Sequence, residues 1–122
     1  MDWTAARRRH AERYSELLKG VDGVITPVQA SYGCHVYHIY AIRVADPFAM
    51  QDALKERGVF TAMHYPVPLH LQKAYAFMGK GKGSFPVAEK CAEGQLSLPM
   101  FAELTDEQLV YVADQIKDIL GA

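Results

Sequence analysis

The chain has 122 residues, of which 50% are hydrophobic and 22% charged, and its formal net charge is −1. This size and composition predict one globular domain over residues 1–122. The near-neutral charge gives no electrostatic reason to expect nucleic acid or an anionic membrane surface as a partner, and no apolar run is long enough to span a bilayer. The two cysteines, Cys34 and Cys91, do not make a disulfide framework, so free thiols in a cytoplasmic protein are the simpler interpretation.

Helical and extended patterns alternate along the chain. Asp46-Pro47 is typical of a helix start, and Thr105 with Gln108 is typical of a capping box. Apolar periodicity and glycine or proline stops set the other boundaries. The expected helices cover about residues 3–19, 46–58, 86–93 and 105–120, with a helical turn or two in 69–78, and the expected strands cover 24–26, 35–44, 59–63 and 96–98.

This order of elements predicts an α+β fold: a two-layer sandwich with a small sheet of three or four strands and helices mainly on one face. The strand over 35–44 is the richest in β-branched and aromatic residues. Both of its faces carry large side chains, with His38 on the side expected to be core or interface. The second face is therefore covered by the first and last helices, or it meets another chain.

The segment from His64 to His70 reads His-Tyr-Pro-Val-Pro-Leu-His. Its two prolines exclude helix and central strand, because each lacks an N–H and restricts the residue before it. The sequence therefore predicts a stiff, extended loop that presents His64, Tyr65 and His70. Either this loop is a binding site held by a rigid scaffold, or it is a surface connection with two solvated histidines.

Several further motifs follow this loop in a fixed order. They are residues 70–75 (His-x-Gln-x-Ala-Tyr), 85–90 (Phe-Pro-Val-Ala-Glu-Lys), 96–100 (Leu-Ser-Leu-Pro-Met) and 104–108 (Leu-Thr-Asp-Glu-Gln), and the strand at 35–40 precedes them. In order and spacing, from about Arg7 to the end, the chain resembles the C-terminal small domain of the DegT/DnrJ/StrS family of sugar aminotransferases. Members of this family use pyridoxal phosphate (PLP) to transfer an amino group to a keto sugar, usually one attached to a nucleotide.

The resemblance implies the small domain of a fold-type I PLP aminotransferase. It implies a substrate-binding role for His64, Tyr65 and His70 and, less directly, for Tyr75, since histidine and tyrosine can hydrogen-bond sugar hydroxyls and phosphates. Family members are longer, and their large N-terminal domain holds the cofactor lysine. None of the seven lysines here has that lysine's sequence context. We therefore expect no catalytic residue and no cofactor bound by this chain alone.

The sequence gives weaker evidence for a metal site, a phosphate-binding loop or a pair of catalytic carboxylates. His35 and His38 point to opposite faces of the expected strand, and neither cysteine has a CxxC partner, so no metal site is predicted. The glycine-rich stretch 79–84 lacks phosphate-loop spacing and reads as a mobile surface connection. Glu89 and Glu93 lie four residues apart and read as the solvated face of a short helix.

These observations leave two classes of function open. The first is a domain or fragment of a nucleotide-sugar aminotransferase that contributes a substrate wall and is not catalytic by itself. The second is a stand-alone module that oligomerises or binds a small molecule such as a sugar nucleotide. A homodimer, and a separate chain that supplies the large aminotransferase domain, are the partners expected; unpartnered apolar surface on the first helix favours such association.

Overall fold

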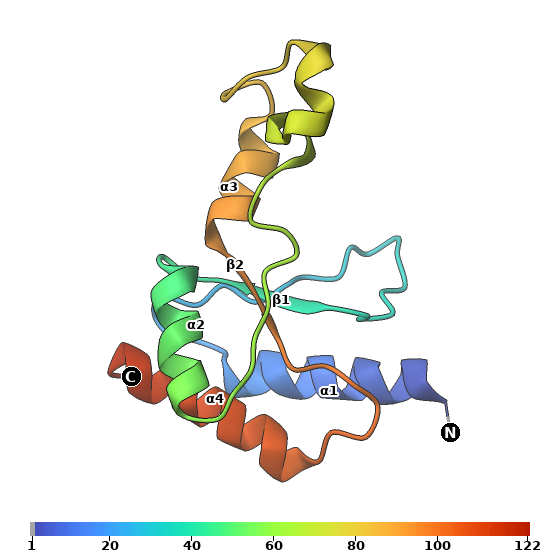
Figure 1. Cartoon of the computed structure of the whole chain (residues 1–122). Coiled ribbons are helices and arrows are strands. Elements are labelled where there is room, and N and C mark those ends of the chain that lie inside the picture. Colours follow the sequence, from blue (N-terminus) through green and yellow to red (C-terminus); the bar gives the residue numbers. More distant parts are fainter. Residues whose placement is uncertain (1) are drawn as a thin grey trace.

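The computed structural model describes residues 2–122, which divide into a compact body and a projecting arm (Figure 1). The elements of the body are α1 (Trp3–Leu17), β1 (Tyr40–Arg43), α2 (Pro47–Glu56), β2 (Gln95–Leu98) and α4 (Asp106–Leu120). The arm, residues 64–94, contains the short 3-10 helices η1 (Leu69–Leu71) and η2 (Lys73–Met78) and the helix α3 (Pro86–Gly94). This mixture of helices and a small antiparallel sheet confirms the predicted α+β class.

The sheet has two strands and not the three or four predicted. β1 and β2 are antiparallel, with Tyr40 opposite Leu98 and Arg43 opposite Gln95. The outer segments that were expected to be strands each supply one isolated bridge, Ile25 to Arg43 on one side and Ala62 to Ser97 on the other. The sheet is therefore a two-stranded core with one pairing contact at each edge.

The long strand predicted over residues 35–44 is wrong in its first half. Only Tyr40–Arg43 is strand, and His38 is exposed, not a core residue. Tyr37 adopts a positive φ of 47°, and its N–H donates to His35 Nδ1 at 2.8 Å, which closes a local loop. β2 is only four residues long, so residues before Tyr40 have no strand to pair with.

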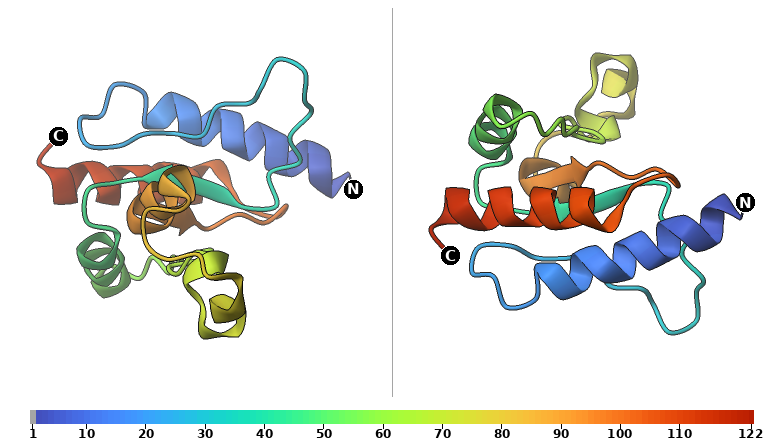
Figure 2. Two further views of the ribbon diagram at one scale, coloured as in Figure 1. Left: turned by 90° about the horizontal axis from the view of Figure 1, so that it is seen from above. Right: turned by 90° about the horizontal axis from the view of Figure 1, so that it is seen from below.

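The body has one apolar core. Helices α1 and α4 lie side by side on one face of the sheet, and α2 packs against α4 and β2 on the side away from α1 (Figure 2). The largest fully buried side chains are Tyr14, Leu18, Tyr40, Ile42, Leu54, Leu96, Leu109 and Ile116. The hydroxyl of Tyr14 donates to the Pro99 carbonyl at 3.1 Å, so this buried polar group is satisfied. α1 thus has a partner within the chain, although Trp3 at its start stays exposed.

The predicted helix starts are confirmed. The Asp46 carboxylate accepts from the Ala49 N–H at 3.0 Å, and Thr105 and Gln108 form both bonds of a capping box. At the end of α3, Gly94 approaches β1 closely: its carbonyl accepts from the Val44 N–H at 2.9 Å, and a Cβ here would lie 3.3 Å from the Val44 carbonyl oxygen. A larger residue at this junction would require the Val44 carbonyl or the end of α3 to shift by a few tenths of an ångström.

The arm has almost no apolar interior. Of residues 64–94, all of which the structure describes, only His70, Glu89 and Ala92 are buried. The core cluster of the body takes no member from this segment. Across the described residues no helix is both long and apolar enough to cross a membrane.

Candidate functional site

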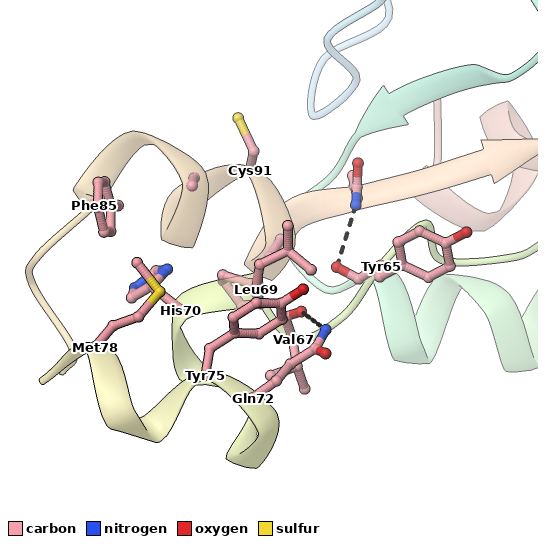
Figure 3. A pocket seen from close by; sticks show the side chains of 13 residues that line it. Tyr65, Val67, Leu69, His70, Gln72, Tyr75, Met78, Phe85 and Cys91 are labelled. Carbon is pink, nitrogen blue, oxygen red and sulfur yellow. Dashed lines mark hydrogen bonds between the residues drawn. The ribbon is translucent and has the colours of Figure 1, made fainter. Parts of the chain in front are cut away.

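A pocket of about 600 Å³ lies in the arm, between η1, η2 and α3 (Figure 3). Its wall is apolar and aromatic, and no lysine, arginine, aspartate or glutamate lines it. Its aromatic, histidine and glutamine lining residues are Tyr65, His70, Gln72, Tyr75, Phe85 and Gln95. A concave apolar wall with a few polar groups is typical of a small-molecule site or of a surface that meets another protein segment.

Three of the four residues predicted to bind substrate line this pocket. Tyr65 is 69% exposed and Tyr75 is 38% exposed, whereas His70 is 8% exposed and lies in the pocket wall. Tyr65 comes from the proline-rich loop, His70 from η1 and Tyr75 from η2, so the arm brings together residues that are up to ten positions apart in the chain. The two tyrosines offer hydroxyl groups and ring faces, and His70 offers a ring nitrogen.

His64 lies apart from the other three. Its Nδ1 is 2.9 Å from the Ser97 hydroxyl oxygen, and it lines a second pocket of about 460 Å³, shared with His38 and edged by β2. The peptide bond between His64 and Tyr65 is cis, and their rings meet edge to face with centroids 5.6 Å apart. The structure thus separates two neighbours that the sequence pattern treats as one motif.

The prediction that Glu89 lies on the solvated face of a helix is wrong. Glu89 is only 8% exposed, whereas Glu93, one turn later, is exposed. The Glu89 carboxylate accepts from the Gly83 N–H at 2.9 Å and from the Phe85 N–H at 3.2 Å, and it lies 2.9 Å from His70 Nε2. The Gly83 N–H lowers the pKa of Glu89 most; the Phe85 N–H and His70 lower it further, against the opposing effect of burial. Glu89 is therefore an ionised, internal acceptor.

Two glutamines were missed by the sequence reasoning. Gln95 Nε2 donates to the Tyr65 carbonyl at 3.4 Å, and Gln72 Nε2 donates to the Val67 carbonyl at 3.3 Å, so both amides fix the backbone of the proline-rich loop (Figure 3). Gln72 belongs to the motif at residues 70–75, but nothing in that motif indicates that the Gln72 side chain bonds the backbone of the proline-rich loop.

The lysines of this chain do not fit the role of the cofactor lysine in a PLP enzyme. That role needs a lowered pKa, which burial or a nearby cation supplies. Six of the seven lysines are exposed, and the seventh, Lys117, pairs with Asp114 at 3.1 Å on α4. None of them lines the arm pocket. No step through PLP can therefore be assigned to residues of this chain.

The other residues considered for metal, cysteine or phosphate chemistry either lie apart from each other or make hydrogen bonds within the fold. Cys34, His35 and His38 are exposed on the loop before β1, and Cys91 lies in the arm pocket. Within residues 2–122, no three His, Cys, Asp or Glu side chains are grouped so as to hold a metal ion. The stretch 79–84 uses the Gly83 N–H to bind Glu89.

Solved aminotransferases share this architecture. The structure of DesV from S. venezuelae in complex with a ketimine intermediate superposes with a TM-score of 0.93 at 34% identity, covering 98% of this chain and 32% of that one. Among curated proteins, a pleiotropic regulatory protein of Geobacillus stearothermophilus is 45% identical over 118 residues, covering 95% of this chain and 32% of that protein. A UDP-N-acetyl-3-dehydro-alpha-D-glucosamine 3-aminotransferase of Acidithiobacillus ferrooxidans is 40% identical, covering 93% of this chain and 30% of that protein.

The fold is thus one found within sugar-modifying aminotransferases. Residues 1–117 match the DegT/DnrJ/EryC1/StrS aminotransferase family, and the chain belongs to this family. It spans about a third of the length of the curated relatives it matches.

Proposed function

We propose that this chain is the C-terminal small domain of a PLP-dependent aminotransferase acting on a nucleotide-linked keto sugar, and that it does not transaminate by itself. The observation that carries the proposal is the combination of family membership with the absence of a suitable lysine: the chain has a family fold, but its lysines are solvent-facing or paired on α4. PLP would be held by the larger part of a complete enzyme, on the same polypeptide or on a separate chain. A cytoplasmic location belongs to the proposal, since both cysteines are free thiols.

The direct test is to mix the purified chain with PLP and to record the absorption spectrum before and after dialysis. We expect no cofactor band that survives dialysis and no amino transfer to a keto sugar. A stable band that a single Lys→Ala change abolishes would contradict the non-catalytic part of the proposal, as would turnover by the chain alone.

Within the complete enzyme, we assign the arm to the substrate wall, with Tyr65, His70 and Tyr75 facing one pocket and His64 facing the next. The tyrosine hydroxyls and the histidine rings supply groups that bind hydroxyls and phosphates, and the aromatic faces can cover a sugar or a base. Titrating the ¹⁵N-labelled chain with UDP-N-acetylglucosamine or dTDP-glucose should shift signals of Tyr65 and Tyr75. Tyr111, an exposed tyrosine of α4 whose hydroxyl donates to the Arg57 carbonyl at 2.9 Å, is the control that should not move. Equal shifts at Tyr111 would indicate non-specific binding and contradict the assignment.

A second candidate function, a module that assembles with another polypeptide, is favoured by one observation. The arm exposes large apolar side chains, including Phe77 at 84%, and the body exposes Trp3 and Phe60. Apolar surface of this kind usually meets a partner, and a second copy of the chain is the simplest one. Sedimentation equilibrium should then show a homodimer at micromolar concentration that Phe77→Ser weakens. A monomer at all concentrations would exclude the homodimer.

A further inference from the structure

The buried carboxylate of Glu89 is the point at which three segments of the arm meet. It is on the first turns of α3, it accepts from the backbone of Gly83 and Phe85 in the preceding loop, and it contacts His70 of η1. Hydrogen bonds to an ionised acceptor are stronger than neutral ones. Because the arm contributes nothing to the apolar core of the body, these bonds have a larger share in fixing its shape than they would have in the body.

The same carboxylate decides how the ring of His70 is placed. An ionised carboxylate only accepts hydrogen bonds, so the contact at 2.9 Å places a proton on His70 Nε2. The ring also meets Phe85 edge to face, with centroids 4.8 Å apart. The ring is therefore held by a polar contact at one edge and an aromatic contact beside it.

The second ring nitrogen, Nδ1, is turned to a different environment. Within residues 2–122, the hydrogen bond of the His70 ring is made by Nε2, so Nδ1 has no partner. Thr61 Oγ1 is the one side-chain nitrogen or oxygen of these residues that is both fully buried and without a partner, so Nδ1 keeps some accessible surface. The cavity next to His70 is the arm pocket. In a neutral ring with its proton on Nε2, Nδ1 is an acceptor.

We propose that Glu89 is a positioning residue: it holds His70 as the Nε2–H tautomer, so that Nδ1 faces the arm pocket as an acceptor for a hydroxyl group of the sugar. The sugar part of this inference rests on the proposed function; the positioning part does not. A hydroxyl has a proton to give to Nδ1, whereas an ionised phosphate oxygen has none. The pocket lining, which includes no lysine or arginine, agrees with a sugar rather than a diphosphate at this point.

The tautomer is tested on the ¹⁵N-labelled chain by long-range proton–nitrogen NMR at about pH 8, above the ordinary titration range of histidine. We expect a protonated Nε2 and an unprotonated Nδ1 for His70. In Glu89→Gln this preference should be lost, and the amide protons of Gly83 and Phe85 should exchange at least about tenfold faster. Glu93→Gln is the matched control, because Glu93 is exposed on the same helix, and it should change neither reading.

The amide signals of β1 and β2 report whether a variant still folds. His70→Gln is a second test of the Glu89 contacts, because the glutamine side-chain amide can still donate to Glu89. We expect His70→Gln to keep slow exchange at Gly83 and Phe85. A protonated Nδ1 in the unaltered chain, or an unchanged tautomer in Glu89→Gln, would overturn the inference without touching the proposed function.

The sugar part is tested with UDP-N-acetylglucosamine against UDP alone. A shift of His70 Nδ1 with the former and not with the latter supports the assignment to a hydroxyl. An equal shift with UDP overturns it. If neither compound shifts any signal of the arm while the tautomer results hold, the positioning role stands, and the evidence counts against the proposed function of the pocket.

Discussion

The body and the arm are stabilised by different kinds of contact. The body has a continuous apolar core between α1, α4, α2 and the sheet. The arm exposes most of its apolar side chains, and its buried polar residues, His70 and Glu89, bond each other. Removing apolar contacts should therefore unfold the body, whereas removing one carboxylate should loosen the arm and leave the body intact. Segments with few buried apolar contacts open more readily than the core of a fold.

The largest expected effect is a truncation in the core of the body. Ile42 lies in β1 and is fully buried, so Ile42→Ala should lower the free energy of unfolding by about 2–5 kcal/mol. The same kind of change in the arm, Leu69→Ala at a side chain that is 65% exposed, should stay within about 0.5 kcal/mol. Urea denaturation followed by circular dichroism measures both. Similar losses for the two variants would mean that the arm shares the core of the body.

The next effect in size concerns the start of α4. Thr105→Ala removes the hydroxyl that accepts from the Gln108 N–H at 3.3 Å, which should cost about 0.5–2 kcal/mol of stability. Thr105→Ser keeps the hydroxyl and should restore most of it. The same denaturation experiment measures the two variants, and an alanine variant as stable as the serine variant would show that the capping box contributes nothing.

A smaller, local effect is expected when the pH falls. The Gly83 N–H, more than any other group, holds the pKa of Glu89 below its ordinary value of 4.5. The stabilisation that Glu89 provides is therefore complete above that value and is lost as the pH falls through the lowered pKa in the folded chain. As the pH falls from 4.5 through the lowered pKa of Glu89, the amide signals of Gly83 and Phe85 should shift, whereas those of β1 and β2 should stay. A simultaneous change in both regions would show that arm and body loosen together.

The smallest effect belongs to an ion pair on the surface of the body. Arg13 Nε donates to Asp106 Oδ1 at 2.7 Å and Arg13 Nη2 to Oδ2 at 3.3 Å, a fork geometry that joins α1 to the start of α4. This bond raises the pKa of Arg13 and lowers that of Asp106. Arg13→Gln should lower the urea midpoint slightly, and about 1 M salt should abolish the difference. Arg9→Gln, at an exposed arginine of the same helix, is the control. An equal decrease of the urea midpoint in Arg9→Gln would show that the Arg13–Asp106 pair is not the cause.

The same contrast explains what the sequence could and could not predict. In the body, apolar periodicity and capping residues act locally, so α1, α2 and α4 were predicted to within a few residues. The first half of the strand over 35–44 was wrong because strand length depends on a partner, and β2 offers only four residues. β-branched and aromatic composition cannot show how long the partner is.

In the arm, the burial of Glu89 could not be read from its spacing. Glu89 and Glu93 look equivalent in the sequence, but only Glu89 contacts the backbone of Gly83 and the ring of His70. Gly83 lies in the loop before α3, and His70 is distant in the chain, so neither contact follows from local spacing. The proline-rich loop was predicted correctly over residues 64–68, because prolines act on their own backbone. His70, which was expected on the same extended loop, lies in η1 and is buried. The loop's separation of His64 from Tyr65, onto different pockets, follows from contacts with Ser97 and Gln95 that no local pattern encodes.

The bridge between Ala62 and Ser97 has a consequence for changes in the segment between them. Ala62 N–H donates to the Ser97 carbonyl at 3.1 Å and Ser97 N–H to the Ala62 carbonyl at 2.7 Å, so the chain leaves and re-enters the sheet at adjacent positions. An insertion whose two ends are clamped together can be lengthened, shortened or exchanged while the scaffold beneath it keeps its register. The pairing of Ala62 with Ser97 therefore keeps the two ends of this segment together while the residues between them change in number or kind.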